Sequence, residues 1–178
     1  MGGTVIETEN LKLVVRDPAE VLTWIDALSD SDRAEVSADW IARVRAAESA
    51  DPWVCGFVMV HRASDAVVGS CGYKSPPGHD GIVEIAYGVD PDHQGQGYAT
   101  EAAKAMVAYA FASGRVRTVR AHTRPEPSQS TRVLTKCGFE RLGEVVEPED
   151  GLVWRWEIHY GRKIIVHEVL DGRIGDHA

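Results

Sequence analysis

The chain has 178 residues, of which 44% are hydrophobic and 26% charged, and this is the composition of a globular protein. Seventeen glycines and eight prolines are too few for collagen or a low-complexity scaffold. The formal net charge of −8 opposes binding to nucleic-acid phosphates and to anionic lipid surfaces. We therefore expect a single globular domain over residues 1–178, with neither nucleic acid nor membrane as a partner.

The cysteines and histidines give no sign of a metal centre. Cys55, Cys71 and Cys137 are widely separated and form no Cys-x-x-Cys pair, so we expect reduced cysteines in the core. The seven histidines have no metal-ligand spacing, and we predict no metal. The N-terminus lacks the basic residues and apolar run of a signal peptide, and no apolar stretch is long enough to span a bilayer, which favours a cytoplasmic location.

The N-terminal half alternates between strand and helix patterns. Residues 5–15 alternate as a strand, and Asp17 with Pro18 has the pattern of a helix cap and first helical position. Helical spacing follows at residues 21–28, and a second helical pattern runs through Val36, Trp40 and Val44 until Asp51-Pro52. Two β-rich runs, residues 53–60 and 66–73, flank turn residues and predict an antiparallel pair.

The C-terminal half contains a β-α-β arrangement. A long helix over residues 97–113, ended by Gly114, separates strands predicted at residues 82–89 and 118–123. The remaining predicted elements are a helix over residues 128–137 and strands over residues 139–146, 152–160 and 163–169. This order predicts an α+β fold, in which a mixed, mostly antiparallel sheet with one parallel crossover is flanked by helices.

A glycine-rich turn lies between a predicted strand and the longest predicted helix. Residues 94–100 read Gln-Gly-Gln-Gly-Tyr-Ala-Thr. Free N–H groups at a helix start attract anions, and Gly95 and Gly97 allow the backbone to approach phosphate oxygens closely. The turn therefore has the properties of a diphosphate site. It departs from the dinucleotide fingerprint of doubly wound folds, because Thr100 stands where the third glycine is required.

A calcium loop is a weaker reading of the same residues. Asp90, Asp92, Gln94 and Glu101 fall at ligand positions 1, 3, 5 and 12 of an EF-hand loop, and Gly95 falls at its glycine position 6. The preceding segment has the pattern of a strand, whereas an EF-hand loop is entered from a helix. The missing helical context disfavours calcium.

Two segments resemble the GCN5-related N-acetyltransferase (GNAT) family. Residues 94–99 match its Gln/Arg-x-x-Gly-x-Gly/Ala signature, placed between a strand and a long helix. Residues 130–139, Ser-Thr-Arg-Val-Leu-Thr-Lys-Cys-Gly-Phe, are similar to a segment of the RimJ/RimL-like branch, which resembles ribosomal-protein N-terminal acetyltransferases. The likeness in element order extends over residues 11–157. It implies a single-domain GNAT fold with a splayed central parallel pair, and leaves residues 163–178 as a C-terminal extension.

The resemblance implies acetyl-CoA as co-substrate and assigns residues to it. The backbone of Tyr87, Gly88 and Val89 would pair with the pantetheine arm. The diphosphate would bind the turn formed by Gln94, Gly95, Gln96, Gly97, Tyr98, Ala99 and Thr100. Ser130 matches a serine near the thioester sulfur, although a helix-start serine is an equally good reading. Leu134 stands where many members have a catalytic tyrosine.

The resemblance also makes Glu84 the candidate general base, since similar enzymes often place a carboxylate near this strand. Such a base is useful because an ammonium must lose its proton before it can attack a thioester. An ordinary exposed strand glutamate is the alternative. The implied activity is transfer of an acetyl group to a primary amine by direct attack. The acceptor would be a small molecule or a protein N-terminus, and a homodimer is compatible with the resemblance. A catalytically silent acyl-CoA sensor would keep the turn at residues 94–100 but need neither Glu84 nor Ser130.

Overall fold

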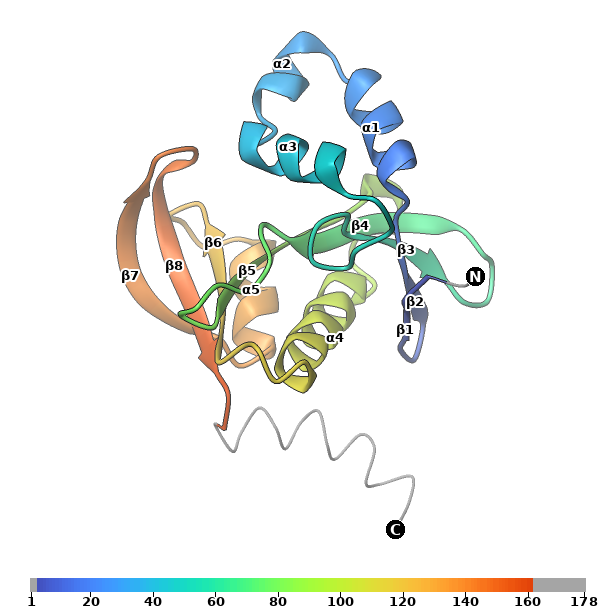
Figure 1. Ribbon diagram of the computed structural model, residues 1–178. Helices are drawn as coiled ribbons and strands as arrows, with labels where there is room; N and C mark the ends of the chain where they lie inside the picture. Colours follow the sequence, from blue (N-terminus) through green and yellow to red (C-terminus); the bar gives the residue numbers. More distant parts are fainter. Residues whose placement is uncertain (1–2, 162–178) are drawn as a thin grey trace. The chain divides into compact units, whose positions relative to one another are not determined.

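The computed structural model describes residues 3–161, and their elements are drawn in Figure 1. Two compact units divide the chain. Among the described residues, unit 1 comprises 3–76 together with 86–98, and unit 2 comprises 77–85 and 99–161. Strand β5 (Ile82–Val89) begins in unit 2 and ends in unit 1, and helix α4 (Tyr98–Ala112) begins at the last residue of unit 1.

Unit 1 contains an antiparallel sheet in the order β1-β2-β3-β4. Its strands are Val5–Glu7, Leu11–Val15, Phe57–His61 and Val67–Tyr73. The single strand predicted over residues 5–15 is wrong, because the segment folds back as a hairpin. Thr8 closes the turn: its backbone N–H donates to the Leu11 carbonyl at 2.9 Å, and the Leu11 N–H donates to its hydroxyl at 3.1 Å. The predicted antiparallel pair is confirmed as β3 and β4.

Three helices, α1 (Pro18–Asp26), α2 (Asp30–Ala34) and α3 (Ala38–Ala46), complete unit 1. The predicted cap of α1 is confirmed, because the Asp17 carboxylate accepts a hydrogen bond from the Ala19 N–H at 2.8 Å. The second helical pattern divides in two, since the Ser37 hydroxyl caps a new helix by accepting from the Trp40 N–H at 3.4 Å. A buried apolar cluster holds α1 and α3, and consists of Val21, Ile25, Val44, Val54 and Cys55.

Unit 2 contains the first half of β5 followed by β6, β8 and β7 in that spatial order. The last three are Thr118–Thr123, Gly151–His159 and Glu140–Glu147. β5 pairs with β6 in parallel, and the other two pairings are antiparallel. The predicted parallel crossover is therefore confirmed. The predicted bounds of β5 and β6 also agree with the structure, because Gly and Pro turns mark the ends of these strands in the sequence.

The strands of unit 2 have one apolar and one polar face. Successive strand residues point to opposite faces, and the register pairs Val119 with Ile158 and Ala121 with Trp156. All four side chains are buried. The intervening positions are polar and pair Arg120 with Glu157 and His122 with Arg155. Residues of α4 and α5 (Gln129–Lys136) add to the core, among them Met106 and Leu134, which are fully buried.

The remaining sequence predictions concern the end of α4, the C-terminal residues, the cysteines and membrane-spanning helices. Gly114 ends α4 in the left-handed region, with φ at +73°. The strand predicted over residues 163–169 and the extension over residues 163–178 lie outside the described residues. All three cysteines are free and buried, as expected. Within residues 3–161, no helix has the length and apolar character needed to cross a membrane.

Gly69 marks a close approach between β4 and the end of β5. A Cβ added to Gly69 would overlap the Gly88 carbonyl oxygen and lie 3.0 Å from the Val89 Cα, whereas a Cβ on Gly88 would meet nothing within 4 Å. Because backbone must move to admit the extra atom, Gly69→Ala should lower the free energy of unfolding by about 1–3 kcal/mol. Gly88→Ala is the matched control and should remain near wild type. Urea unfolding of both variants checks this, and equal stabilities would contradict it.

Candidate functional site

The glycine-rich turn precedes α4 and is attached to the end of β5. Gly95 and Gly97 have φ values of +78° and +84°, in the region that favours glycine. The Gln94 side-chain amide donates to the Val89 carbonyl at 3.0 Å, and the Tyr98 hydroxyl donates to the Gln96 side chain at 3.2 Å. These bonds fix the turn beside the strand residues that the sequence assigned to pantetheine.

Space is available around this turn for a ligand. No atom of residues 3–161 lies within 4 Å of a Cβ built on Gly95 or Gly97, so these positions require glycine for their backbone conformation and not because neighbouring atoms crowd them. A helix of 15 residues follows, whose first N–H groups have no partners within the helix. Asp90 directly follows β5 and Asp92 lies within a 3-10 turn (Pro91–His93), so a strand, and not the helix of an EF-hand, enters this loop.

Tyr87, Gly88 and Val89 form the last part of β5. The parallel register with β6 covers Ile82 to Glu84, while β5 itself continues to Val89. The backbone of a strand can offer hydrogen-bonding groups to a peptide-like arm. This is the position that the resemblance assigned to pantetheine.

Glu84 occupies the polar face of unit 2 and is mostly buried, with its side chain 16% exposed. Its carboxylate contacts Nδ1 of His122, whose ring is only 6% exposed. The alternative of an ordinary exposed strand glutamate is therefore wrong. A carboxylate with a fixed partner and limited access to water is suited to accepting a proton from a bound amine.

His122 belongs to a chain of polar groups that crosses four strands. The Arg155 guanidinium donates from Nε to His122 Nε2 at 3.1 Å and from Nη2 to the Glu147 carboxylate at 2.6 Å. The Glu147 carboxylate lies 3.6 Å from His122 Nε2. Glu84, His122, Arg155 and Glu147 come from β5, β6, β8 and β7 respectively, and we call them the charged row.

A second ion pair lies on the same polar face. Arg120 donates from Nε and Nη2 to one oxygen of Glu157, at 2.9 and 2.6 Å. His159 lies 3.6 Å from Glu157, and its other ring nitrogen is 2.9 Å from the Thr118 hydroxyl. Because a buried carboxylate without a partner is costly, these contacts stabilise the polar face as a unit.

Ser130 is exposed and is the second residue of α5. It does not cap the helix. Ser128 does so, because its hydroxyl accepts from the Thr131 N–H at 3.3 Å, while the Thr131 hydroxyl accepts from the Ser128 N–H at 2.9 Å. The alternative prediction of a helix-start serine is confirmed, because Ser130 lies in the first turn of α5, and within the described chain its hydroxyl makes no hydrogen bond.

The cysteines do not provide a nucleophile. Burial raises the pKa of Cys71 to about 12 and also raises the pKa of Cys55. The Cys137 thiol is buried and lies 3.7 Å from the Thr100 carbonyl oxygen, which agrees with its predicted packing role. Leu134, at the position of the family's tyrosine, is fully buried. Direct attack on the thioester needs none of these residues.

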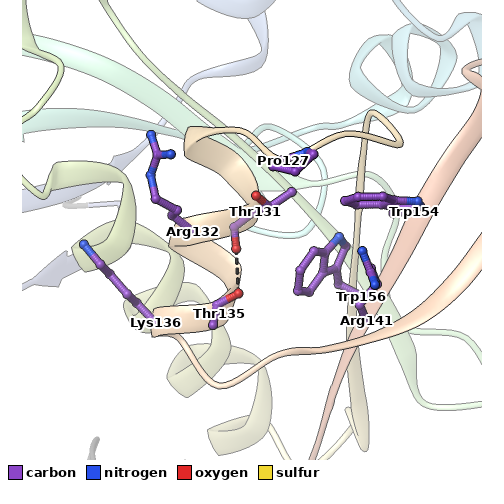
Figure 2. A pocket seen from close by; sticks show the side chains of 8 residues that line it. All are labelled: Pro127, Thr131, Arg132, Thr135, Lys136, Arg141, Trp154 and Trp156. Atoms are coloured by element: carbon purple, nitrogen blue, oxygen red, sulfur yellow. Dashed lines mark hydrogen bonds between the residues drawn. The ribbon is translucent and has the colours of Figure 1, made fainter.

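A groove of about 350 Å³ lies beside α5, and Figure 2 shows its lining. Trp154 and Trp156 form one side, and the guanidinium of Arg141 lies 4.2 Å from the centre of the Trp154 ring. Figure 2 shows Arg132 and Lys136 extending from α5 away from the two tryptophans. Because Trp154 and Trp156 alternate with Arg155 along β8, the groove and the charged row occupy opposite faces of that strand.

Residues 7–140 match the acetyltransferase (GNAT) domain family. The chain belongs to this family. It is 29% identical over 111 residues to the uncharacterized N-acetyltransferase p20 of Bacillus licheniformis, a match that covers 62% of this chain and 58% of that protein. It is 27% identical over 113 residues to the ribosomal-protein-serine acetyltransferase of Escherichia coli, covering 58% and 63%. The chain thus spans less than two thirds of either curated relative.

A solved structure supports the same fold assignment. The ribosomal alpha-N-protein acetyltransferase RimL, solved in complex with coenzyme A, superposes with a TM-score of 0.64 at 16% identity. The superposition covers 88% of this chain and 98% of that one. The GNAT fold and the likeness to ribosomal-protein acetyltransferases, both expected from residues 94–99 and 130–139, are confirmed.

Three members of the charged row were missed by the sequence analysis, namely His122, Glu147 and Arg155. One signal was present: His122 and Arg120 occupy alternate positions of β6, between the buried residues Val119, Ala121 and Thr123. That alternation predicts a polar face. It does not name the partners, which come from strands that the sequence cannot align.

The two serines at the start of α5 allow a direct test of these positions. Ser128→Ala removes the cap and should lower the free energy of unfolding by about 1 kcal/mol. Ser130→Ala, the matched control two residues away, should leave the free energy of unfolding unchanged, because the Ser130 hydroxyl makes no hydrogen bond in the described structure. Thermal and urea unfolding measure both. If Ser130→Ala were less stable than Ser128→Ala, Ser128 would not be the cap of α5.

Proposed function

We propose that this chain is an acyl-CoA-dependent N-acyltransferase that transfers an acetyl group from acetyl-CoA to a primary amine. Membership of the GNAT family supports the co-substrate. The mostly buried Glu84, with its carboxylate held by His122, is the observation that supports amine chemistry. Glu84 lies on the strand that continues to Val89 and leads into the glycine-rich turn.

The residues around that turn fit the proposed co-substrate. The backbone N–H groups from Gln94 to Thr100 would bind the diphosphate, with room left by Gly95 and Gly97. The backbone of Tyr87, Gly88 and Val89 would bind the amides of the pantetheine arm. Acetyl-CoA supplies the activated acetyl group, and the protein supplies orientation and proton transfer.

Glu84 would take the proton that keeps the acceptor from reacting. A lysine-like amine, with a pKa of about 10.4, is almost entirely an ammonium ion at neutral pH. Once its proton passes to the Glu84 carboxylate, the nitrogen attacks the thioester carbonyl, an amide bond forms and the carbon–sulfur bond breaks. As the amide forms, the attacking nitrogen loses its second proton, and this proton reaches the departing thiolate through the Ser130 hydroxyl or through water. The amide and the CoA thiol are then released, and Glu84 returns its proton to solvent.

The charge of the polar face favours a cationic acceptor. This face carries three carboxylates, of Glu84, Glu147 and Glu157, and two guanidiniums, of Arg120 and Arg155, which leaves one net negative charge, and the whole chain carries a net charge of −8. A negative surface attracts amines in their ammonium form before Glu84 removes the proton. Small polyamine-like or aminoglycoside-like molecules and protein N-termini both satisfy this requirement.

The glycine-rich turn can be tested by adding a negative charge to it. Gly97→Asp should lower the affinity for CoA by more than about tenfold, because it strains a positive φ and places a carboxylate beside the diphosphate. Gly114→Asp is the matched control, since Gly114 has a φ of +73°, similar open surroundings and lies at the other end of α4. Calorimetry on the folded variants measures both affinities. Unchanged affinity in Gly97→Asp would contradict the assignment.

The role of Glu84 can be tested by replacing it with its amide. Glu84→Gln should lower kcat by about 10²- to 10⁴-fold at neutral pH, with CoA affinity nearly constant, because the amide cannot accept the proton. Higher pH should recover part of the rate, since more acceptor is then already deprotonated. Thiol release from acetyl-CoA across a panel of amines is the assay.

Glu144→Gln is the matched control for this test, because Glu144 lies on β7, which β6 and β8 separate from β5, and bonds only the Trp154 indole among the contacts described. It should keep the wild-type rate. A wild-type rate and pH profile in Glu84→Gln would contradict the assignment of the base. A wild-type protein that binds acetyl-CoA but releases no thiol with any amine would favour the silent sensor.

A further inference from the structure

We infer that Arg155 fixes the tautomer of His122, and that both are positioning residues for the Glu84 carboxylate. This inference rests on the proposed function, in which Glu84 is the base. The observations that support it are different from those that support Glu84 as the base. They concern which nitrogen of His122 accepts from Arg155 and which nitrogen contacts Glu84.

Arg155 determines which nitrogen of His122 carries the proton. A guanidinium has only donors, and its Nε–H points at His122 Nε2 from 3.1 Å. That nitrogen must therefore present its lone pair, and the neutral ring carries its proton on Nδ1. Nδ1 is the nitrogen that contacts the Glu84 carboxylate. The protonated nitrogen of His122 is therefore the one in contact with the carboxylate of the base, and this contact is the only one that the described residues give to Nδ1, which otherwise has no hydrogen-bond partner.

Because the His122 ring is buried, its tautomer determines how the Glu84 carboxylate is oriented. With only 6% of the His122 side chain exposed, the ring has little room to turn. The other tautomer would direct the lone pair of Nδ1 at a carboxylate oxygen, and the two groups would repel each other. Glu84 would then leave the orientation in which it meets the acceptor nitrogen. Small displacements of this kind reduce proton transfer strongly.

Arg155 is itself held in place by the last member of the row. Its Nη2 donates to Glu147 at 2.6 Å, so the guanidinium has a carboxylate on one side and the imidazole on the other. His122 and Arg155 are also direct partners in the β6–β8 register. Glu147 thus orients Arg155, Arg155 orients His122, and His122 orients Glu84.

The same geometry limits where the proton can go. Because His122 Nε2 is occupied by the Arg155 donor, the ring cannot pass a proton onward from Glu84 along the row. The proton taken from the acceptor must leave Glu84 toward solvent or product. His122 consequently orients the base and does not act as a relay.

Three variants and one control separate positioning from general structure. His122→Leu and Arg155→Met should each lower kcat by about 10- to 100-fold, the range seen when a partner orienting an active-site group is removed. The KM for acetyl-CoA should stay within about twofold. His122→Asn should retain most of the rate, because its amide can donate to Glu84 from near the Nδ1 position. Arg141→Met, on the opposite face, is the matched control and should remain at wild-type kcat.

A spectroscopic measurement tests the tautomer without reference to activity. Two-bond ¹H–¹⁵N correlation spectra of protein labelled with ¹⁵N-histidine report which ring nitrogen carries the proton, and His122→Asn identifies the His122 signals. The wild type should show the Nδ1–H form. Arg155→Met should populate the Nε2–H form, because the donor that excludes it is gone. Thermal unfolding verifies that each variant is folded.

The outcomes distinguish this inference from the proposed function. An Nε2–H tautomer in the wild type overturns the inference. So does a slow Glu84→Gln variant combined with wild-type kcat in folded His122→Leu and Arg155→Met. If Glu84→Gln itself keeps the wild-type rate, the base assignment fails, and the positioning role fails with it. The inference is supported when Glu84→Gln, His122→Leu and Arg155→Met are all slow and His122→Asn is not.

Discussion

The two-residue period of β6 and β8 is the constraint on which unit 2 depends. It places Val119 and Ala121 on the face that belongs to the core, and Arg120 and His122 on the face that carries charge. A slip of one residue between the strands would exchange these faces, bury the charges and expose the apolar side chains. The hydrophobic core therefore fixes the register, and the register fixes which charged groups meet.

That register brings the members of the charged row together, and burying them has a cost in free energy. Removing carboxylates and a guanidinium from water is unfavourable, and replacing a buried ion pair with apolar residues is often neutral or stabilising. Stability alone gives little reason for His122 and Arg155 to occupy these positions. Their arrangement is explained by the orientation of Glu84, since each hydrogen bond along the row limits the freedom of the next group.

The sequence could predict those features that depend on neighbouring residues. The Asp17 cap, the bounds of β5 and β6 and the turn with Gly95 and Gly97 are all local, since each needs only a few adjacent side chains and the backbone freedom of glycine. Periodicity failed where a short polar segment bends the chain. Thr8 turns the predicted strand into a hairpin, and Ser37 starts a new helix within a continuous apolar pattern.

The sequence by itself determined the family, the parallel crossover and the glycine-rich turn, because each can be recognised from a pattern of residues that are neighbours in the chain. Only the tertiary structure decided the surroundings of Glu84. His122 and Arg155 are 33 positions apart in the chain, and the distance between their side chains depends on how β6 aligns with β8. That alignment results from the packing of apolar side chains on the other face of the strands. No local pattern encodes it, because the contact energy that selects it is summed over the whole core.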